Sequence, residues 1–497
     1  MSVFVKPTWL SWICGICLLA AFPAVLSAQT GSIGLNYTGV TLADGMTLNS
    51  NNGYAPPDNG GGVGPNHVVQ LINGAYAVYE KTTGTQVQLI AGKQFWINAG
   101  VDPGNNIVNL GAFNQRILFD PTVNRWIAAG LTGHTTDNSV MIARSDTSDP
   151  TGTWKAVSFL GNDGLTGKFA DFTNLGVDAD GVYVSTNNFP SNTANVGFEY
   201  AMVFSLPKAD LMASTPSIAN LTQFGALTEN LAGWQSLQPI VDFGPSKGHA
   251  PILQRQQVPA QFTPLRRFDL TGTTGPGATL EASVEIDADA YVGPPLASQP
   301  DLTRTISTID GRIASHAYQV GDTIYAVHNT KQGNNAALSV LIVDEPTNQL
   351  VDEIVLGDAD FDYFNGSIAA NHLGEIVVGF TRSGMVNGGN LSSFAVVGQH
   401  SGGSTTFGDP FLLKEGLVDD YHVFNDRWGD FTTTVVDPFD PRVFWTFQEF
   451  ALASDAWATQ ITQIIVPEPS ALVLSGAALA LIAAAGYYRH RRSPLSV

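Results

Sequence analysis

Short apolar runs separated by turn residues dominate the chain between residues 58 and 466. Each run is about as long as a β-strand and is ended by Gly, Asn, Asp or Pro before a helical period can develop. Val, Ile, Thr and aromatic residues, which favour strands, fill these runs. The pattern predicts an all-β fold.

One unit recurs along this segment: an apolar strand, a tight turn and a second apolar strand. The first instance, HVVQLINGAYAVYE (67–80), turns at Asn73-Gly74, a dipeptide typical of a β-hairpin. The other predicted turns are Asp120-Pro121, Asp180-Gly181, Gly244-Pro245, Gly321-Asp322, Leu373-Gly374 and Asp437-Pro438. The intervals between units hold a further pair of strands, for example VMIARSD and TWKAVSF. The repeating unit is therefore about four strands long and occurs about seven times.

Four-stranded units repeated around an axis form a β-propeller. We therefore predict a single β-propeller over residues 58–466, with about seven four-stranded blades and with six or eight as the alternatives. Residues 29–57 are assigned as an N-terminal extension. A β-helix would have shorter and more uniform coils, and a row of sandwich domains would need linkers.

The first 28 residues have the pattern of a secretory signal peptide. An apolar run from about Trp9 to Val25 follows Lys6, and the small residues Ser27-Ala28 predict cleavage after Ala28. Such a signal peptide implies export through the Sec machinery, with an uncleaved N-terminal anchor as the alternative. The only cysteines, Cys14 and Cys17, lie inside the apolar run, so the mature chain is expected to carry no disulfide.

Residues 471–488 are uncharged and predict a transmembrane helix. At 1.5 Å per residue this stretch is roughly 27 Å long, about the thickness of a bilayer core. The arginines that follow are Arg489, Arg491 and Arg492. Because basic clusters stay on the cytoplasmic side, residues 493–497 are expected to form a cytoplasmic tail, with the body of the protein outside.

Pro467, Glu468 and Pro469 come directly before this helix, in a segment that prolines keep extended. The order of Pro-Glu-Pro, apolar helix and arginine cluster over 467–492 resembles the PEP-CTERM sorting signal of Gram-negative bacteria. The resemblance implies transient residence in the inner membrane and recognition by an exosortase, a membrane transpeptidase that cuts near the motif. A permanent C-terminal anchor is the alternative.

The charge of the chain is strongly negative. The precursor has a net charge of −20, and residues 29–466 keep 19 basic and 42 acidic side chains, which makes this segment still more acidic. Nucleic-acid binding, which needs clustered Lys and Arg, is therefore not expected. Acidity does suit divalent cations, and the alternating Asp358, Asp360 and Asp362 are candidate calcium ligands. An acidic loop in contact with solvent is the simpler interpretation.

Four stretches together resemble bacterial secreted β-propellers of sialidase-like or BNR-like architecture, a group mostly without assigned activity. These stretches are 56–84, 143–159, 170–189 and 425–450. Within the second, SDTSDPTGTW is similar to an Asp-box, with Ser145, Asp149, Gly152 and Trp154 in the corresponding order. In an Asp-box the Asp caps a tight turn and the Trp packs between sheets, so this resemblance implies a structural role.

Asp171, Arg427 and Asp430 are the candidate catalytic residues. Asp171 stands seven residues before Asp178, as Asp430 stands seven before Asp437, so both carboxylates are expected at the start of an inner strand, facing the central channel. An Arg–Asp pair that ties neighbouring blades together is the simpler interpretation. The chain has no H-E-x-x-H, G-x-S-x-G or Walker motif.

These patterns favour a protein at the cell surface or outside the cell that binds extracellular polysaccharide or another envelope component. The alternative is a glycan hydrolase or lyase that uses carboxylates at the mouth of the channel. Several carboxylate or arginine side chains converging in one solvent-open pocket would favour catalysis. A channel lined by aliphatic side chains and glycine would favour binding.

Overall fold

The computed structural model describes residues 30–102, 107, 111–164, 166–190, 197–225, 235–255, 265–301, 304–424 and 426–468. Strands dominate these residues, which confirms the all-β prediction. The helices are short: α1 (Leu42–Leu48), α2 (Gly92–Asn98) and α4 (Lys208–Met212). Within the described ranges no helix is long and apolar enough to cross a membrane. The predicted signal peptide (1–28) and transmembrane helix (471–488) lie outside these ranges.

In the described part of the chain, most of the strands fall into seven successive antiparallel groups, and the first four lie between residues 60 and 286. The first group is β2 (Gly60–Val63), β3 (His67–Ile72), β4 (Ala75–Glu80) and β5 (Gln86–Ala91). The second group is β6 (Ala112–Asp120), β7 (Arg125–Thr132), β8 (Ser139–Ser145) and β9 (Trp154–Leu160). The third group is β10 (Phe169–Val177), β11 (Gly181–Phe189), β12 (Tyr200–Pro207) and β13 (Thr222–Phe224). The fourth group is β14 (Gln238–Asp242), β15 (His249–Arg255), β16 (Leu265–Thr271), β17 (Thr279–Leu280) and β18 (Val284–Ile286).

Three groups and a separate strand pair follow. The pair is β19 (Ala297–Ser298) with β20 (Thr305–Ile306). The fifth group is β21 (Ala317–Val320), β22 (Thr323–Gln332), β23 (Asn335–Asp344) and β24 (Gln349–Leu356). The sixth is β25 (Asp362–Ala370), β26 (Glu375–Ser383), β27 (Ser392–Ser401), β28 (Ser404–Phe407) and β29 (Phe411–Lys414). The seventh contains β30 (Thr433–Val436), β31 (Val443–Ala453) and β32 (Ala456–Ile465).

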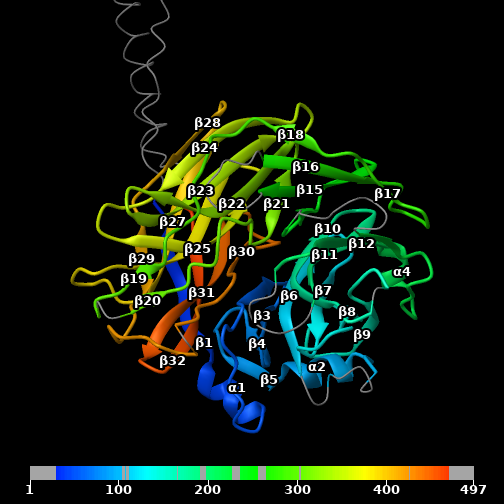
Figure 1. Cartoon of the computed structure of the whole chain (residues 1–497), viewed down its shortest axis with the longest axis horizontal. Coiled ribbons are helices and arrows are strands. Elements are labelled where there is room, and N and C mark those ends of the chain that lie inside the picture. Colours follow the sequence, from blue (N-terminus) through cyan, green and yellow to red (C-terminus); the bar gives the residue numbers. More distant parts are fainter. Residues whose placement is uncertain are drawn as a thin grey trace, which may run out of the picture.

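The first strand of each group faces the centre of a ring. Strands β2, β6, β10, β14, β21, β25 and β30 contact one another in this cyclic order, and β30 returns to contact β2. Figure 1 shows the groups following one another around this centre from blue to orange. The arrangement is propeller-like.

A strand from the N-terminal segment completes the seventh group. β1 (Ser32–Thr41) pairs antiparallel with β32, which gives the sheet order β1-β32-β31-β30. Asn36 reinforces this pairing, because its side-chain oxygen accepts hydrogen bonds from Gln460 and Thr462. The segment 29–57, assigned as an extension from sequence, therefore contributes a strand that joins the two ends of the described chain.

All seven predicted turns connect adjacent antiparallel strands. Six of them join the first and second strands of a group, whereas Asn73-Gly74 joins the second and third strands, β3 and β4. The first strand of that group is β2, the glycine run Gly60-Gly61-Gly62-Val63. A Cβ on Gly61 would lie 2.4 Å from a ring carbon of Phe447 in β31, so the close approach of these two groups requires glycine here.

Buried asparagines fix where the inner strands begin. Asn73 accepts a hydrogen bond from the backbone N–H of Asn114, and Asn138 from that of Ala170. Asn187 accepts in the same way from the backbone N–H of Ser236, just before the fourth group, and Asn329 accepts from that of Asn365, near the start of the sixth group. Each amide ties one group to the next, so the first residues of these inner strands, or in the fourth group the segment just before it, are held in place around the ring.

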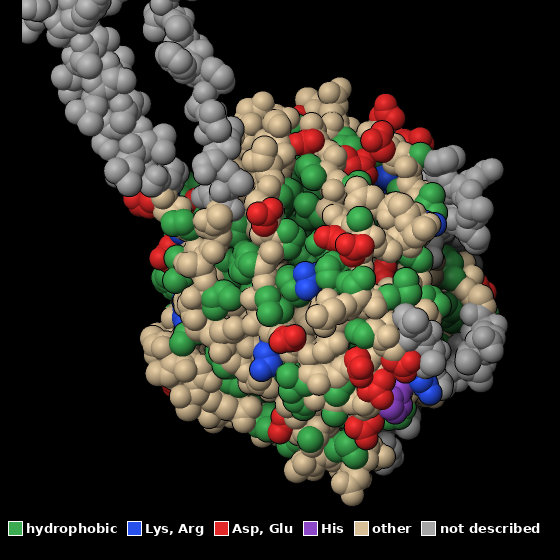
Figure 2. Space-filling view, turned by 90° about the vertical axis from the view of Figure 1, so that its left-hand side faces the viewer, with side chains coloured by type: hydrophobic (Ala, Val, Ile, Leu, Met, Phe, Trp, Pro, Cys, Tyr) green, Lys and Arg blue, Asp and Glu red, His purple; other side chains and the backbone are tan. Residues whose placement is uncertain are grey.

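Acidic side chains are dispersed over the surface. The face in Figure 2 shows many Asp and Glu side chains and few Lys and Arg, with hydrophobic side chains between them. This distribution agrees with the net charge of −20.

Candidate functional site

Charged side chains gather where the inner strands begin. We call this group the charged mouth; its members are Asp58, Asp171, Asp310, Arg312, Arg427 and Asp430. Arg427 donates to the Asp430 carboxylate at 2.8 Å, and the backbone N–H of Asp430 donates to Asp58 at 3.0 Å. The charges of Asp430, Asp58 and Asp171 raise the pKa of Arg427, although burial lowers it. The structure thus brings the three candidate residues together, and it adds three that the sequence did not single out as catalytic candidates.

The charged mouth reaches from solvent into the protein. The Arg427 side chain is 45% exposed, Asp430 is 20% exposed, and Asp58 is buried beneath them. Burial, reinforced by the charge of Asp430, raises the pKa of Asp58 to about 8. Burial also raises the pKa of Asp430, against the opposing charge of Arg427. The mouth therefore offers an accessible guanidinium, that of Arg427, above a buried Asp58 that holds its proton more tightly than a free aspartate does.

Arg116 blocks the ring below the charged mouth. From β6 it donates to the carbonyls of Thr173 and Ala314, each at 2.9 Å, and so links the second group to the third and to the segment just before the fifth. Its guanidinium lies 3.2 Å from the centre of the Phe431 ring, and Phe431 meets Phe172 edge-on. We call Arg116, Phe172 and Phe431 the plug. No local motif in the sequence marked Arg116, because its partners are up to 198 residues away.

An apolar cavity of about 460 Å³ lies toward the other ends of the inner strands. Its wall includes one residue from each of six inner strands: Val63, Leu118, Val241, Tyr318, Ala370 and Val435. Its rim includes Asp242 at the end of β14, and His372 and Phe439 in the turns that follow two other inner strands. Since the charged mouth stands where these strands start, the ring has a charged end and an apolar end, separated by the plug.

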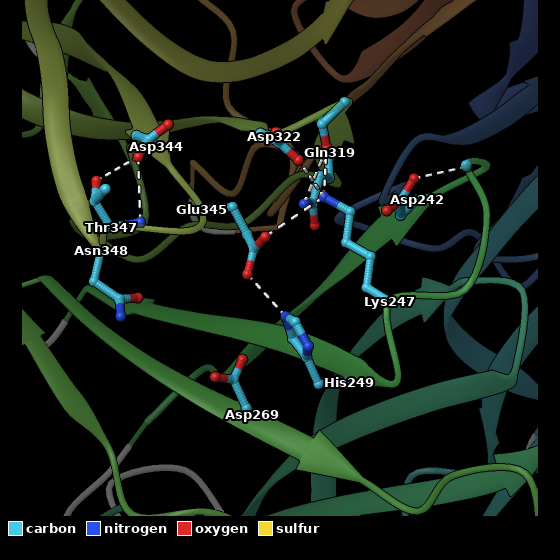
Figure 3. A network of polar contacts seen from close by, with 12 residues as sticks. Asp242, Lys247, His249, Asp269, Gln319, Asp322, Asp344, Glu345, Thr347 and Asn348 are labelled. Carbon is cyan, nitrogen blue, oxygen red and sulfur yellow. Dashed lines mark hydrogen bonds and ion pairs between the residues drawn. The ribbon is translucent and has the colours of Figure 1, made fainter.

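A network of ion pairs flanks the rim between the fourth and fifth groups. Glu345 accepts a hydrogen bond from His249 at 2.8 Å and pairs with Arg267, while Lys247 pairs with Asp322 at 3.1 Å. Figure 3 shows His249 and Lys247 directed at Glu345. Burial raises the pKa of Glu345, but the hydrogen bond from His249 and the charge of Arg267 outweigh it and lower the pKa. These side chains pair with one another within the protein, so we assign the network a structural role: it holds the fourth and fifth groups together.

The Asp-box-like residues form the turn between β8 and β9. Ser145 accepts from the backbone N–H of Trp126 at 2.9 Å, and the Asp149 carboxylate accepts from the backbone and hydroxyl of Thr151. The backbone N–H of Gly152 donates to the carbonyl of Asp149 at 3.3 Å. Trp154 is 6% exposed and packs edge-on against Tyr76 and Phe95. The turn lies on the outer strands, and its contacts are those of a structural element.

The candidate calcium ligands do not share a site. Asp362 is buried, and its carboxylate accepts hydrogen bonds from the backbone and hydroxyl of Ser298 and from the backbone of Ala336. Asp358 instead accepts from the backbone N–H of Asp360. Among the residues that the structure describes, no group of three or more His, Cys, Asp or Glu is placed to hold a metal ion.

The residues of the termini are described only in part. Pro467 and Glu468 leave the body just after β32, and Glu468, 85% exposed, pairs with Arg442 at 2.7 Å. The remaining residues singled out at the termini lie outside the described ranges: Ala28, Pro469, Arg489, Arg491 and Arg492.

No protein-family model matches this chain, and neither does any curated protein. Solved structures show distant similarity. A protein of unknown function from Dyadobacter fermentans is 11% identical with a TM-score of 0.41, over 72% of this chain and 95% of its own. Drosophila Semaphorin 1b extracellular domains 1-2 are 6% identical with a TM-score of 0.39, over 88% of both chains. An exo-β-1,3-galactanase from Clostridium thermocellum is 9% identical with a TM-score of 0.32, over 84% of this chain and 97% of its own.

Proposed function

We propose that this chain is an exported seven-bladed β-propeller that binds an extracellular polysaccharide at the charged mouth. The observation that carries the proposal is the convergence of Arg427, Asp430 and their neighbours at the start of the inner strands, with Arg427 open to solvent. Guanidinium groups donate to sugar hydroxyls and carboxylates accept from them, so a site that offers both suits a polyhydroxylated ligand. The closed cyclic order of the inner strands supports seven blades.

The proposal includes the route to the cell surface. A signal peptide over 1–28 would direct the chain to the Sec machinery, and the PEP-CTERM-like segment 467–492 would hold it in the inner membrane until an exosortase cuts it. The exposed position of Glu468, directly after the last strand, supports access by a protease. The processed protein would then lie at the cell surface or be released.

A glycan hydrolase or lyase is the second candidate, because the pKa of Asp58 is raised to about 8, as in general acids. Two contacts argue for binding instead. Asp58 is 1% exposed, and its two oxygens already accept from Asn73 and from the backbone of Asp430. A buried carboxyl with both oxygens engaged is poorly placed to protonate a glycosidic oxygen.

A glycan array probed with the full chain in mild detergent tests the proposal. We expect retention of at least one polysaccharide class and a loss of about tenfold or more in affinity for Arg427→Ala. Arg266→Ala is the matched control, because Arg266 forms an ion pair with Glu285 on outer strands away from the mouth. Equal binding by the two variants, or binding to no glycan, would reject the site. Release of new reducing ends from a bound glycan, abolished by Asp430→Asn, would establish the enzymatic alternative.

A further inference from the structure

Asp242 is a buried carboxylate of the apolar cavity that has no cation paired with it among the described residues. It ends β14, is 7% exposed and lines the cavity. Its Oδ1 atom accepts a hydrogen bond from the backbone N–H of Gly244 at 2.7 Å. Its Oδ2 atom has no hydrogen-bond partner in the described part of the chain, and this atom keeps accessible surface. Buried aspartates are almost always paired, so this oxygen indicates a site for a ligand that brings a positive charge.

The corresponding aspartates of other groups show what Asp242 lacks. Asp120 ends β6 and Asp437 follows β30, and each accepts from the backbone N–H two residues later, as Asp242 does. The second oxygen of each pairs with a lysine ammonium, at 2.6 Å and 2.7 Å respectively: Lys208 and Lys81. Asp178, which follows β10, accepts instead from a tyrosine hydroxyl at 2.9 Å and does not line the cavity. The same kind of turn therefore contains its own cation in two groups, whereas the turn of the fourth group leaves its carboxylate unpaired beside a cavity.

Lys247, five residues along the chain from Asp242, pairs with other carboxylates. Its ammonium lies 3.1 Å from Asp322 and 3.5 Å from Glu345. Figure 3 shows it directed at these two side chains and away from Asp242. Burial raises the pKa of Asp242, and the charges of Glu345 and Asp322 raise it further, against the opposing charge of Lys247. Carboxylates thus outnumber cations on this side of the rim, so its potential attracts a positively charged group.

The rest of the cavity lining suits an apolar body beside that positive charge. Aliphatic side chains of the inner strands line it together with four aromatic rings: Phe119, Phe243, Tyr318 and Phe439. Aromatic faces attract ammonium groups, and one such contact already exists at the rim, where the Lys81 ammonium lies 5.5 Å from the centre of the Phe439 ring. A volume of about 460 Å³ falls within the usual range of ligand pockets, roughly 300–1,000 Å³.

We propose that the cavity binds a small organic amine with an apolar body, such as an arylalkylamine or a medium-chain alkylamine. The ammonium group donates to Oδ2 of Asp242 at the rim, where the protein supplies the charge that the ligand neutralises. The body lies against the apolar wall, which includes Val63, Leu118 and Val241. This site is separate from the charged mouth, so it can stand if glycan binding fails.

Three water-soluble probes with one common body test the charge of the ligand: 4-phenylbutylamine, 4-phenylbutan-1-ol and 4-phenylbutyrate. Each is titrated calorimetrically into the full chain at pH 8, with the same nonionic detergent buffer as a blank. We expect the amine to bind at least about tenfold more tightly than the alcohol, because hydrogen bonds between charged groups are the stronger ones, and the carboxylate to bind most weakly. Equal affinities for the three probes, or no binding of the amine, would overturn the proposal.

Asp242→Asn tests the position of the ammonium group. This variant removes the charge and keeps an oxygen for the Gly244 N–H, so we expect phenylbutylamine to bind about tenfold more weakly and phenylbutanol to bind as before. The matched control is Asp322→Asn, in the same network but 71% exposed and outside the cavity lining, which should change the affinity for the amine by less than about threefold. If the two variants bind the amine equally, the ammonium does not lie where we place it. The probe series on the wild-type protein needs no variant and decides the question independently of folding.

Discussion

Replacing Asp58 with asparagine should change how the stability of this protein depends on pH. Asp58 lies beneath the charged mouth with a φ of +51°, a left-handed conformation that Asn adopts readily. Its oxygens accept from the Asn73 side chain at 2.9 Å and from the backbone N–H of Asp430 at 3.0 Å. An asparagine at this position would keep the shape and the backbone but could supply only one of these two acceptors.

The expected magnitude follows from the pKa. Burial raises the pKa of Asp58 from 3.8 to about 8. Between these values the folded protein keeps a proton that the unfolded chain releases, so the free energy of unfolding falls as pH rises through this window. Each pKa unit corresponds to about 1.4 kcal/mol, which makes the contribution at most about 6 kcal/mol between pH 4 and pH 8. Asparagine does not titrate, so this contribution disappears in the variant.

Urea unfolding followed by tryptophan fluorescence at pH 5, 6, 7 and 8 measures the effect. The loss of an acceptor by one buried donor should lower the stability of Asp58→Asn by about 1–3 kcal/mol at every pH. Because the wild type has already lost roughly 2 kcal/mol by pH 5 and loses about 4 kcal/mol more by pH 8, the two proteins should differ little at pH 5 and the variant should be the more stable at pH 8. Some slope will remain, since burial also raises the pKa of Asp430 and Glu449. Asp360→Asn, in an exposed loop, is the control. Parallel pH profiles for the wild type and Asp58→Asn would refute the reasoning.

Three further changes test the ion-pair network, the Asp-box-like turn and the seventh group, and each is measured by urea unfolding. Glu345→Gln removes one of the two carboxylates that pair with the buried Arg267 and should cost about 1–3 kcal/mol, whereas Asp322→Asn, 71% exposed, should cost less than about 1 kcal/mol; similar costs would contradict the assigned role. Ser145→Ala removes the acceptor of the buried Trp126 N–H and should cost about 1–3 kcal/mol, and a neutral result would show that the turn does not need it. Deleting residues 30–41 exposes the edge of β32, so we expect a lower unfolding midpoint and aggregation by light scattering; a wild-type midpoint would mean that β1 does not hold the ring closed.

The sequence pattern predicted the strands well because its signals, turn residues and apolar runs, act between residues that are close in the chain. A dipeptide such as Asp180-Gly181 allows the chain to reverse, and the apolar runs on either side supply the strands that pair across it. The same logic did not single out β2, because the run Gly60-Gly61-Gly62 has the composition of a turn and not of a strand. Those glycines are required by side chains far along the sequence, such as Phe447. A strand whose composition is dictated by another group cannot be recognised from its own residues.

The candidate site was likewise predicted only in part from the sequence. Asp171 and Asp430 were selected because their spacing to a later aspartate placed both at the start of an inner strand, and Arg427 because it precedes Asp430. Asp58 and Arg116 were not among the residues selected. Their importance comes from contacts with residues up to 372 positions away in the chain, as in the hydrogen bond between Asp58 and Asp430. No spacing within the sequence reports such a contact.

The sequence by itself determined the class of fold, the repeated four-stranded unit and the positions of the turns, because side-chain alternation and turn preferences act over a few residues. The tertiary structure alone decided that β1 joins the last sheet, that the ring has a charged end and an apolar end, and that Arg116 divides them. These features arise only when strands distant in the chain lie side by side. Burial in that arrangement, and not residue type, raises the pKa of Asp58.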